Sequence, residues 1–172
     1  VTKIKNLSYL NEFGIESLSL SRFKTNFQKF DRILYHFGNS IYHVSFFDLL
    51  KHYPGVSVLH DFYLDGVANL LPSSQENLYV SHGFVANHHV NLPQKFKELP
   101  DYPNNLSVID SSLGVIFHSD YALKLMNYWY GDFGLKKSHV VPFLKKPKIS
   151  FNRKEALKIL NLKSDVFVVT SF

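Results

Sequence analysis

The strongest constraint on the fold is a set of four short apolar runs with helical patterns between them. They are rich in β-branched or aromatic residues and span Arg32–Phe37, Val56–Leu59, Gly114–His118 and Val166–Phe172. None shows the strict alternation of a strand with one face in water, so we expect both faces to be covered, as in a parallel sheet. Val140–Val141, just before Pro142, is a candidate for a fifth, shorter strand.

The segments between these runs have helical periods. Ser119 is placed to cap a helix that Gly131 ends, and Asn152 with Glu155 resembles a capping box. Strands that alternate with helices predict an α/β fold, a Rossmann-like parallel sheet with flanking helices joined by right-handed crossovers. The expected buried face after the third run is Ala122, Leu125, Met126 and Trp129. Apolar residues recur at Val44, Phe47, Leu50 and Tyr53 after the first run, and at Ala156, Leu157, Ile159 and Leu160 near the end.

Residues 62–105 fit this alternation poorly. Prolines interrupt the region, and only a weakly patterned helix from about Glu76 to His89 is indicated. We interpret the region as an elaboration whose loops lie near a ligand. The segment before Arg32 lacks the opening strand and glycine-rich turn of a complete doubly wound domain, and the first residue is Val1. Both features are interpreted as those of a fragment that starts part-way through a domain.

Composition narrows the possible functions. The chain contains no cysteine, which excludes disulfides and thiolate metal sites and fits a reducing compartment such as the cytoplasm. It has no apolar run of ~18 residues, so no segment is expected to span a membrane. The net charge of +5 favours anionic partners, although a solvated basic surface also explains it. Much of the excess lies late, at Lys136, Lys137, Lys145, Lys146, Lys148, Arg153 and Lys154.

Three polar groups stand where strands are expected to end, which is where parallel α/β sheets bind ligands. Gly38-Asn39-Ser40, with His43 one turn later, offers amides for an anion or a hydroxyl, or is a plain strand-to-helix turn. His60-Asp61 combines an imidazole that exchanges protons near neutral pH with a carboxylate, or is a core histidine beside a helix-capping aspartate. In His118-Ser119-Asp120, capping by Ser119 is the simpler interpretation.

A metal site is not expected from the histidines. A catalytic zinc or two-metal site needs three or more converging ligands, and the chain has neither an HExxH motif nor an HxH pair. The adjacent His88 and His89 diverge on either a helix or a strand. Nucleophile-elbow, Walker and GxGxxG patterns are absent as well. The side chains considered as ligands are His60, His82, His88, His89, His118, Asp61 and Asp110.

In order along the chain, several of these segments resemble one family. HFGNS (36–40) followed by His43, PGVSVLHDFYL (54–64) and GVIFHSDYA (114–122) look like the amino-terminal domain of family-four glycosyltransferases with the GT-B fold. VVPFL (140–144), a basic linker and a helix ending in ALKILNL follow. The closing VFVVTSF is similar to the strand that opens that family's second domain. Order and spacing agree over roughly residues 32–172.

The resemblance implies a two-domain enzyme whose amino-terminal half binds the acceptor and whose other half binds a nucleotide-sugar. Residues 1–144 would then be a partial acceptor-side domain, 145–163 a basic linker and helix, and 164–172 the first strand of a donor-binding domain. The family places a histidine near the transferring sugar, which makes His60 the expected catalytic residue. The expected acceptor-binding residues are Gly38, Asn39, Ser40, His43 and Asp61, with Ser119 and His118 in support.

The chemistry implied is retaining transfer of a hexosyl-type group to a glycan, a lipid-linked molecule or another hydroxyl acceptor, with no cofactor besides the donor. Hydrogen-bond donors and helix amino-termini stabilise the leaving phosphate without metal. In the family these groups, a basic pair and two glutamates, follow the point where this sequence stops. We therefore expect the parent protein to be active and this chain alone to be inactive.

The alternative is a non-catalytic α/β module that binds an anionic glycan or lipid head group. It explains the basic surface and the aromatic content (16 Phe, 10 Tyr) as well, although aromatic residues are more often core. A second Rossmann-like half after Phe172 would favour the enzyme. A basic face also suits peripheral contact with the anionic inner face of a membrane, which salt-sensitive vesicle binding would test. Nucleic-acid binding is not expected, because the lysines lack a recognisable reading motif.

Overall fold

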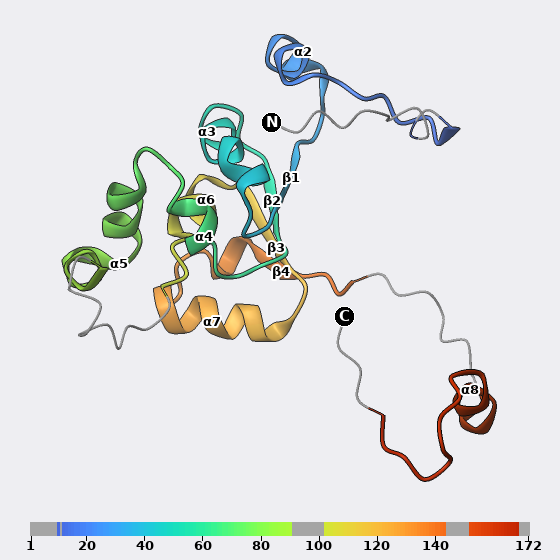
Figure 1. The fold of residues 1–172 in the computed structure, drawn as a ribbon. Coiled ribbons are helices and arrows are strands. Elements are labelled where there is room, and N and C mark those ends of the chain that lie inside the picture. The colour runs from blue at the N-terminus through green and yellow to red at the C-terminus, as the bar shows by residue number, and fades with distance from the viewer. Residues whose placement is uncertain (1–9, 11, 91–101, 144–151, 169–172) are drawn as a thin grey trace. The chain divides into compact units, whose positions relative to one another are not determined.

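The computed structural model describes residues 10, 12–90, 102–143 and 152–168 of the chain. The chain divides into two compact units, Val1–Pro142 and Phe143–Phe172, which are described one at a time. The first contains a parallel sheet with helices packed against it (Figure 1). Among the described helices, none is both long enough and apolar enough to cross a membrane.

The sheet has four parallel strands in chain order: β1 (Leu34–Phe37), β2 (Val56–Leu59), β3 (Gly114–Phe117) and β4 (Ser138–Val140). The predicted Rossmann-like parallel sheet is confirmed. The first three strands fall on predicted runs, whereas β4 starts two residues before the predicted fifth strand. Its polar start hides it in the sequence, because the buried Ser138 hydroxyl is satisfied by donating to the Gly134 carbonyl (2.8 Å).

The connections between strands are helical. The turn η2 (Ile41–His43) and α3 (Val44–His52) join β1 to β2. Helices α4 (Asp65–Ala68), α5 (Ser74–Val90) and α6 (Leu106–Ser111) lie between β2 and β3, and α7 (Asp120–Tyr130) and η4 (Leu135–Lys137) lie between β3 and β4. Before β1 come α2 (Leu20–Asn26) and η1 (Phe27–Lys29). Helices α3, α4, α6 and α7 lie on one side of the sheet (Figure 1). Right-handed crossovers between strands in chain order would place them there.

The core fills the space between these helices and one face of the sheet. Phe37 is fully buried there and meets Phe46 and Phe47 of α3 edge-to-face, with ring centroids 5.8 and 5.5 Å apart. On the opposite face Leu34 is 52% exposed and His36 is exposed as well. The expectation that both faces of every strand are covered is therefore wrong for β1 in the described part of the protein.

The long connection between β2 and β3 contains more helix than its sequence predicts. Helix α5 runs past the expected ends, with a kink at Gly83, whose φ is 75°. Asn104 and Asn105, expected to break structure after a proline, are instead buried. Asn77 Nδ2 donates to Asn104 Oδ1 (2.7 Å), and the Asn105 side chain donates to the Phe62 carbonyl. These bonds satisfy the buried amides, which would otherwise be costly.

Helix α7 has the predicted ends and buried face. The Ser119 hydroxyl accepts from the backbone N–H of Ala122 (3.4 Å), and Gly131 ends the helix with a φ of 61°. Met126 is fully buried at its centre. The predicted cap and stop are therefore confirmed.

The second unit contains α8 (Arg153–Ile159), which the Asn152 side chain caps by accepting from the Lys154 N–H (3.0 Å). Of the predicted strand 166–172, residues 166–168 are not in a strand, and 169–172 lie outside the described residues. Instead, the Arg153 guanidinium donates to the carbonyls of Ser164 (3.2 Å) and Val166 (2.8 Å). Much of the predicted basic linker, 144–151, also lies outside the described residues.

Candidate functional site

Hydrogen bonds fasten the loop after β1 to the loop after β2. The backbone N–H of Asn39 donates to Asp61 Oδ2 (2.9 Å). The Asn39 side chain accepts from the backbone N–H of Val67 (2.9 Å) and donates to Asp65 Oδ1 (3.2 Å). The predicted corner, Gly38-Asn39-Ser40, and Asp61 therefore lie together at the carboxyl rim of the sheet.

Gly38 lets His43 and Asp61 approach this corner. A Cβ atom at position 38 would lie 3.1 Å from His43 Cε1 and 3.4 Å from Asp61 Oδ2, so a side chain there would crowd the imidazole. Ser40 Oγ lies 3.0 Å from His43 Nδ1. Gly38, Ser40, His43 and Asp61 thus form one connected group.

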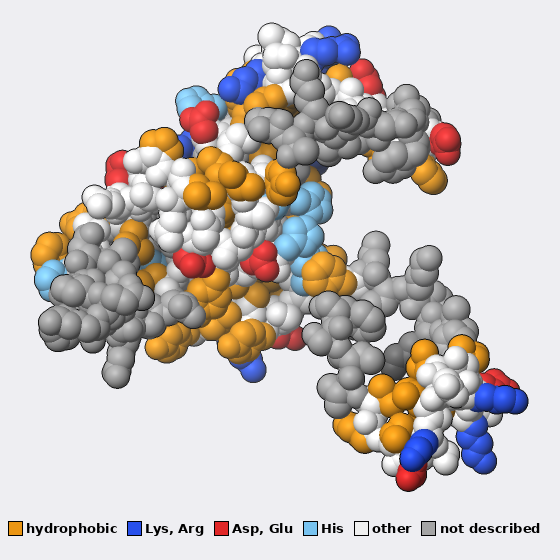
Figure 2. Space-filling model, viewed as in Figure 1, with side chains coloured by type: hydrophobic (Ala, Val, Ile, Leu, Met, Phe, Trp, Pro, Cys, Tyr) orange, Lys and Arg blue, Asp and Glu red, His pale blue; other side chains and the backbone are white. Residues whose placement is uncertain are grey.

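Three imidazoles at the same rim form a hydrogen-bonded line, the histidine row (His36, His60 and His118). His36 Nδ1 lies 2.8 Å from His60 Nε2, and His60 Nδ1 lies 3.2 Å from His118 Nε2. His118 Nδ1 lies 2.8 Å from the backbone carbonyl oxygen of Val141. Figure 2 shows histidine side chains side by side on the surface.

The register of the sheet explains this row. Leu59 is aligned with Phe117 across β2 and β3, and both point into the core. Because side chains alternate along a strand, the next residues, His60 and His118, stand level on the other face. His36, beside the core residue Phe37 of β1, points to that face too, and its ring reaches diagonally to His60.

The surroundings of His60 favour its neutral form. Partial loss of water around the ring lowers the pKa of His60 below its ordinary value, and the nearby His36, His118 and His43 lower it further, while Asp61 opposes them. His60 is nonetheless an exposed residue. At neutral pH the His60 ring is therefore uncharged.

The other histidines considered as metal ligands lie apart from the row. His82 is enclosed by aromatic rings, and its Nε2 accepts from the backbone N–H of Asn104 (3.0 Å). His88 and His89 lie in the last turn of α5. Within the described ranges, no three His, Cys, Asp or Glu side chains are grouped so that they could hold a metal ion.

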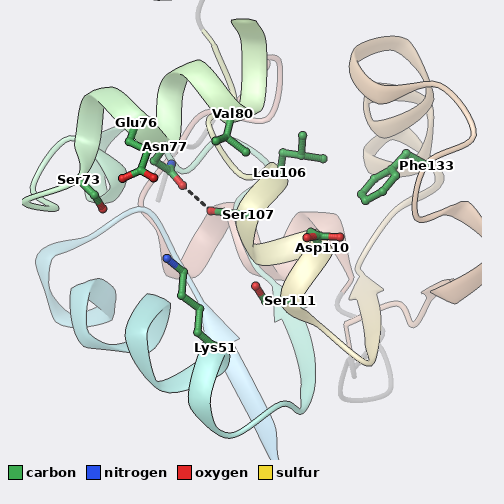
Figure 3. A pocket seen from close by; sticks show the side chains of 10 residues that line it. All are labelled: Lys51, Ser73, Glu76, Asn77, Val80, Leu106, Ser107, Asp110, Ser111 and Phe133. Carbon is green, nitrogen blue, oxygen red and sulfur yellow. Dashed lines mark hydrogen bonds between the residues drawn. The ribbon is translucent and has the colours of Figure 1, made fainter.

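A groove of about 410 Å³ lies on the helix layer between α3, α5 and α6 (Figure 3). Lys51 lines it from α3, Glu76 and Asn77 from α5, and Ser107 and Asp110 from α6, with Ser107 donating to Asn77 across the helices. The ends of α3 and α6 that line the groove lead into the amino ends of β2 and β3. The groove is therefore remote from the carboxyl rim and contains none of the predicted site residues.

No protein-family model, curated protein or solved structure matches this chain. A function therefore rests on the rim and on the motifs themselves. Ser119 caps α7. The predicted residues that the fold brings together at the rim are Gly38, Asn39, Ser40, His43, His60, Asp61 and His118.

Sequence reasoning missed His36 as a member of the site. In the sequence, His36 reads as part of the strand-to-helix turn that follows it, and nothing local indicates that its ring reaches the next strand. One signal was present: VLH (58–60) and IFH (116–118) end their strands alike, and His36 occupies the same face of the neighbouring strand. The bonds of Asn39 to Val67 and Asp65 left no signal, because they join residues more than twenty positions apart.

Proposed function

We propose that this chain forms the acceptor-side half of a nucleotide-sugar-dependent, GT-B-type glycosyltransferase, in which a hydroxyl acceptor binds at the rim beside His60. The observation that carries the proposal is the bond from the Asn39 N–H to Asp61 Oδ2, which joins the corner to the strand end bearing His60. Two motifs far apart in sequence thus share the rim where parallel α/β sheets bind ligands.

The polar groups of the rim suit a hydroxyl better than a phosphate. The Asn39 amide, a potential phosphate donor, already serves Asp61, and the Asp65 carboxylate lies beside the same side chain. Carboxylates and neutral imidazoles both accept hydrogen bonds from hydroxyls. A carboxylate repels an anion, and the accepting nitrogen of a neutral imidazole has no hydrogen to donate to one. A sugar or other polyol is the acceptor that this surface fits. The negative leaving phosphate needs amides and cations, which the donor-binding half would supply.

The contacts of two basic residues weaken the alternative, in which the chain is a non-catalytic module that binds anionic head groups. Lys137, one of the late basic residues, directs its ammonium to the carbonyls of Asp110 (3.0 Å) and Ser112 (2.8 Å) at the end of α6. Arg153 is likewise engaged with backbone carbonyls of its own unit. Both side chains are therefore used to stabilise the fold. Peripheral contact of the chain with an anionic membrane is a separate prediction.

The test uses the protein encoded by the complete reading frame that contains this chain. Release of nucleoside diphosphate is measured with UDP-, GDP- and ADP-sugars as donors and methyl glycosides as acceptors. His60→Ala should lower kcat/KM about 100-fold or more. The control is His52→Ala: His52 is exposed at the end of α3, where its ring contacts Asp48 and the adjacent Tyr53, and rates should stay near wild type. The isolated 172-residue chain should not turn over.

Absence of release with every donor would contradict the proposal. So would full activity of His60→Ala in a protein that transfers sugar.

A further inference from the structure

The hydrogen bonds of the histidine row fix where its protons are. A carbonyl oxygen only accepts, so His118 carries its proton on Nδ1 and donates it to Val141. A neutral imidazole has one N–H, so His118 Nε2 accepts, and His60 Nδ1 must be the donor. By the same step, His60 Nε2 accepts from His36 Nδ1. The neutral row is therefore protonated on Nδ1 throughout.

The ring geometry supports bonds made edge to edge. The ring centroids of His36 and His60 are 5.1 Å apart, which exceeds their 2.8 Å N···N distance by about two ring radii, and the planes differ by only 19°. The N–H of one ring therefore points along the lone pair of the next. The contact between His60 and His118 is more bent, with planes at 34° and centroids 5.0 Å apart.

One nitrogen of the row keeps an accessible lone pair. Among the described residues, no group bonds to His36 Nε2, and His36 is exposed. This nitrogen is the end of the row opposite to the Val141 carbonyl. A proton that arrives from outside can therefore be taken up there without breaking any hydrogen bond.

The row has room for one additional proton. After uptake at His36 Nε2, the Nδ1 proton can pass to His60 Nε2, and the His60 Nδ1 proton can pass to His118 Nε2, with each bond reversed and none lost. A second proton would set two N–H groups against each other. Among the described residues, Asp61 and His43 also act electrostatically on the central ring of His60, besides its row partners. The three rings should thus share a single added proton through their hydrogen bonds.

We propose that His36 is the proton-accepting residue of this site, and that the row acts as a single acid–base group with His36 Nε2 as its open end. The reaction assigned to it rests on the proposed function. The acceptor hydroxyl gives its proton to Nε2, and the O–H electron pair stays on oxygen. That oxygen forms the bond to the anomeric carbon as the bond from this carbon to the donor phosphate breaks, with its pair leaving on the phosphate.

The acid–base unit can be tested without sugar transfer. Long-range ¹H–¹⁵N correlation spectra of the 172-residue chain, recorded through the neutral pH range, report the tautomer and titration of each ring. We expect His36, His60 and His118 to be Nδ1–H when neutral and to share the first added proton. His118→Phe removes the link to Val141, so His60 should lose its fixed tautomer. His139→Gln, at an exposed position of β4, should leave the row unchanged. Nε2–H signals for His60 in the neutral row, or an added proton confined to one ring, would overturn the proposal.

The proton-accepting role is tested in the complete enzyme. His36→Gln retains an amide that can donate to His60 but cannot take up a proton. It should lower kcat about 100-fold or more at neutral pH and abolish the acidic limb of the kcat–pH profile, with acceptor KM changed less than about threefold. An active enzyme in which His36→Gln keeps both kcat and the acidic limb overturns this role and leaves the proposed function standing. If the complete protein transfers no sugar at all, both the proposed function and the catalytic role of His36 are overturned. The spectra still decide whether the row is one acid–base group.

Discussion

Acidification should destabilise the fold through His82. Its ring lies among Tyr102, Trp129 and Tyr130, with ring centroids 5.0, 5.2 and 5.7 Å away. Its Nε2 accepts a hydrogen bond from the backbone N–H of Asn104 (3.0 Å). Burial lowers the pKa of His82 from 6.5 to about 4. Protonation of Nε2 would set an N–H against the Asn104 N–H, so the fold requires the neutral ring.

The sign and size of the effect follow from linkage. Because the pKa of His82 is lower in the folded state, the unfolded chain takes up the proton first as the pH falls. The stabilisation is complete above about pH 6.5 and is lost between pH 6.5 and about pH 4. At ~1.36 kcal/mol per pKa unit, the fall from 6.5 to about 4 corresponds to ~3.4 kcal/mol. Solvent reaches part of the ring, so screening reduces the expected effect to about 2 kcal/mol.

Urea unfolding followed by circular dichroism measures this effect. His82→Gln provides a neutral side chain whose oxygen can accept from Asn104 at every pH. The free energy of unfolding of the wild type, relative to His82→Gln, should fall by about 1.5 kcal/mol between about pH 7.5 and about pH 4.5. His88→Gln, at an exposed position of the same helix, should show no such pH-dependent difference. A difference between wild type and His82→Gln that stays constant over this range would refute the reasoning.

Two further substitutions test the packing. Gly66→Ala should destabilise by about 1 to 3 kcal/mol, because its Cβ would lie 2.8 Å from Asn39 Oδ1. In the control Gly114→Ala the nearest atom is 3.5 Å from the new Cβ, so equal melting temperatures for the two variants would contradict this close approach. Tyr130→Phe should destabilise by about 1 to 2 kcal/mol, because the Tyr130 hydroxyl donates to Asn105 Oδ1 (2.7 Å) in a largely buried site. An unchanged urea midpoint for Tyr130→Phe would count against that contribution.

The sequence predicted the parallel sheet because its signals are local. The runs that became β1, β2 and β3 are short, apolar and separated by helices, and Ser119 and Gly131 mark both ends of α7 by their side-chain chemistry. The meeting of the corner with Asp61 could also be predicted, since the carboxyl ends of parallel strands share one rim. These inferences needed only periodicity, capping and strand direction.

What could not be predicted depends on distant pairs. Asn104 and Asn105 have the composition of an exposed turn, yet their amides are buried against Asn77 and Phe62. His82 looked like a possible metal ligand until the N–H of Asn104 was found at its Nε2. Hydropathy and local spacing carry no information on partners that lie 22 to 43 positions away. These partners decide whether a polar residue is structural or functional.

The bonding within the histidine row also bears on which chemistry the rim can perform. A metal ion takes a lone pair from each imidazole nitrogen that binds it. In the neutral row, His60 Nε2 and His118 Nε2 already accept from the neighbouring rings, whereas no group among the described residues bonds to His36 Nε2. Metal binding by all three rings would require breaking both hydrogen bonds between them, whereas taking up one proton breaks neither. The arrangement therefore suits the uptake of one proton better than the binding of a metal ion by all three rings.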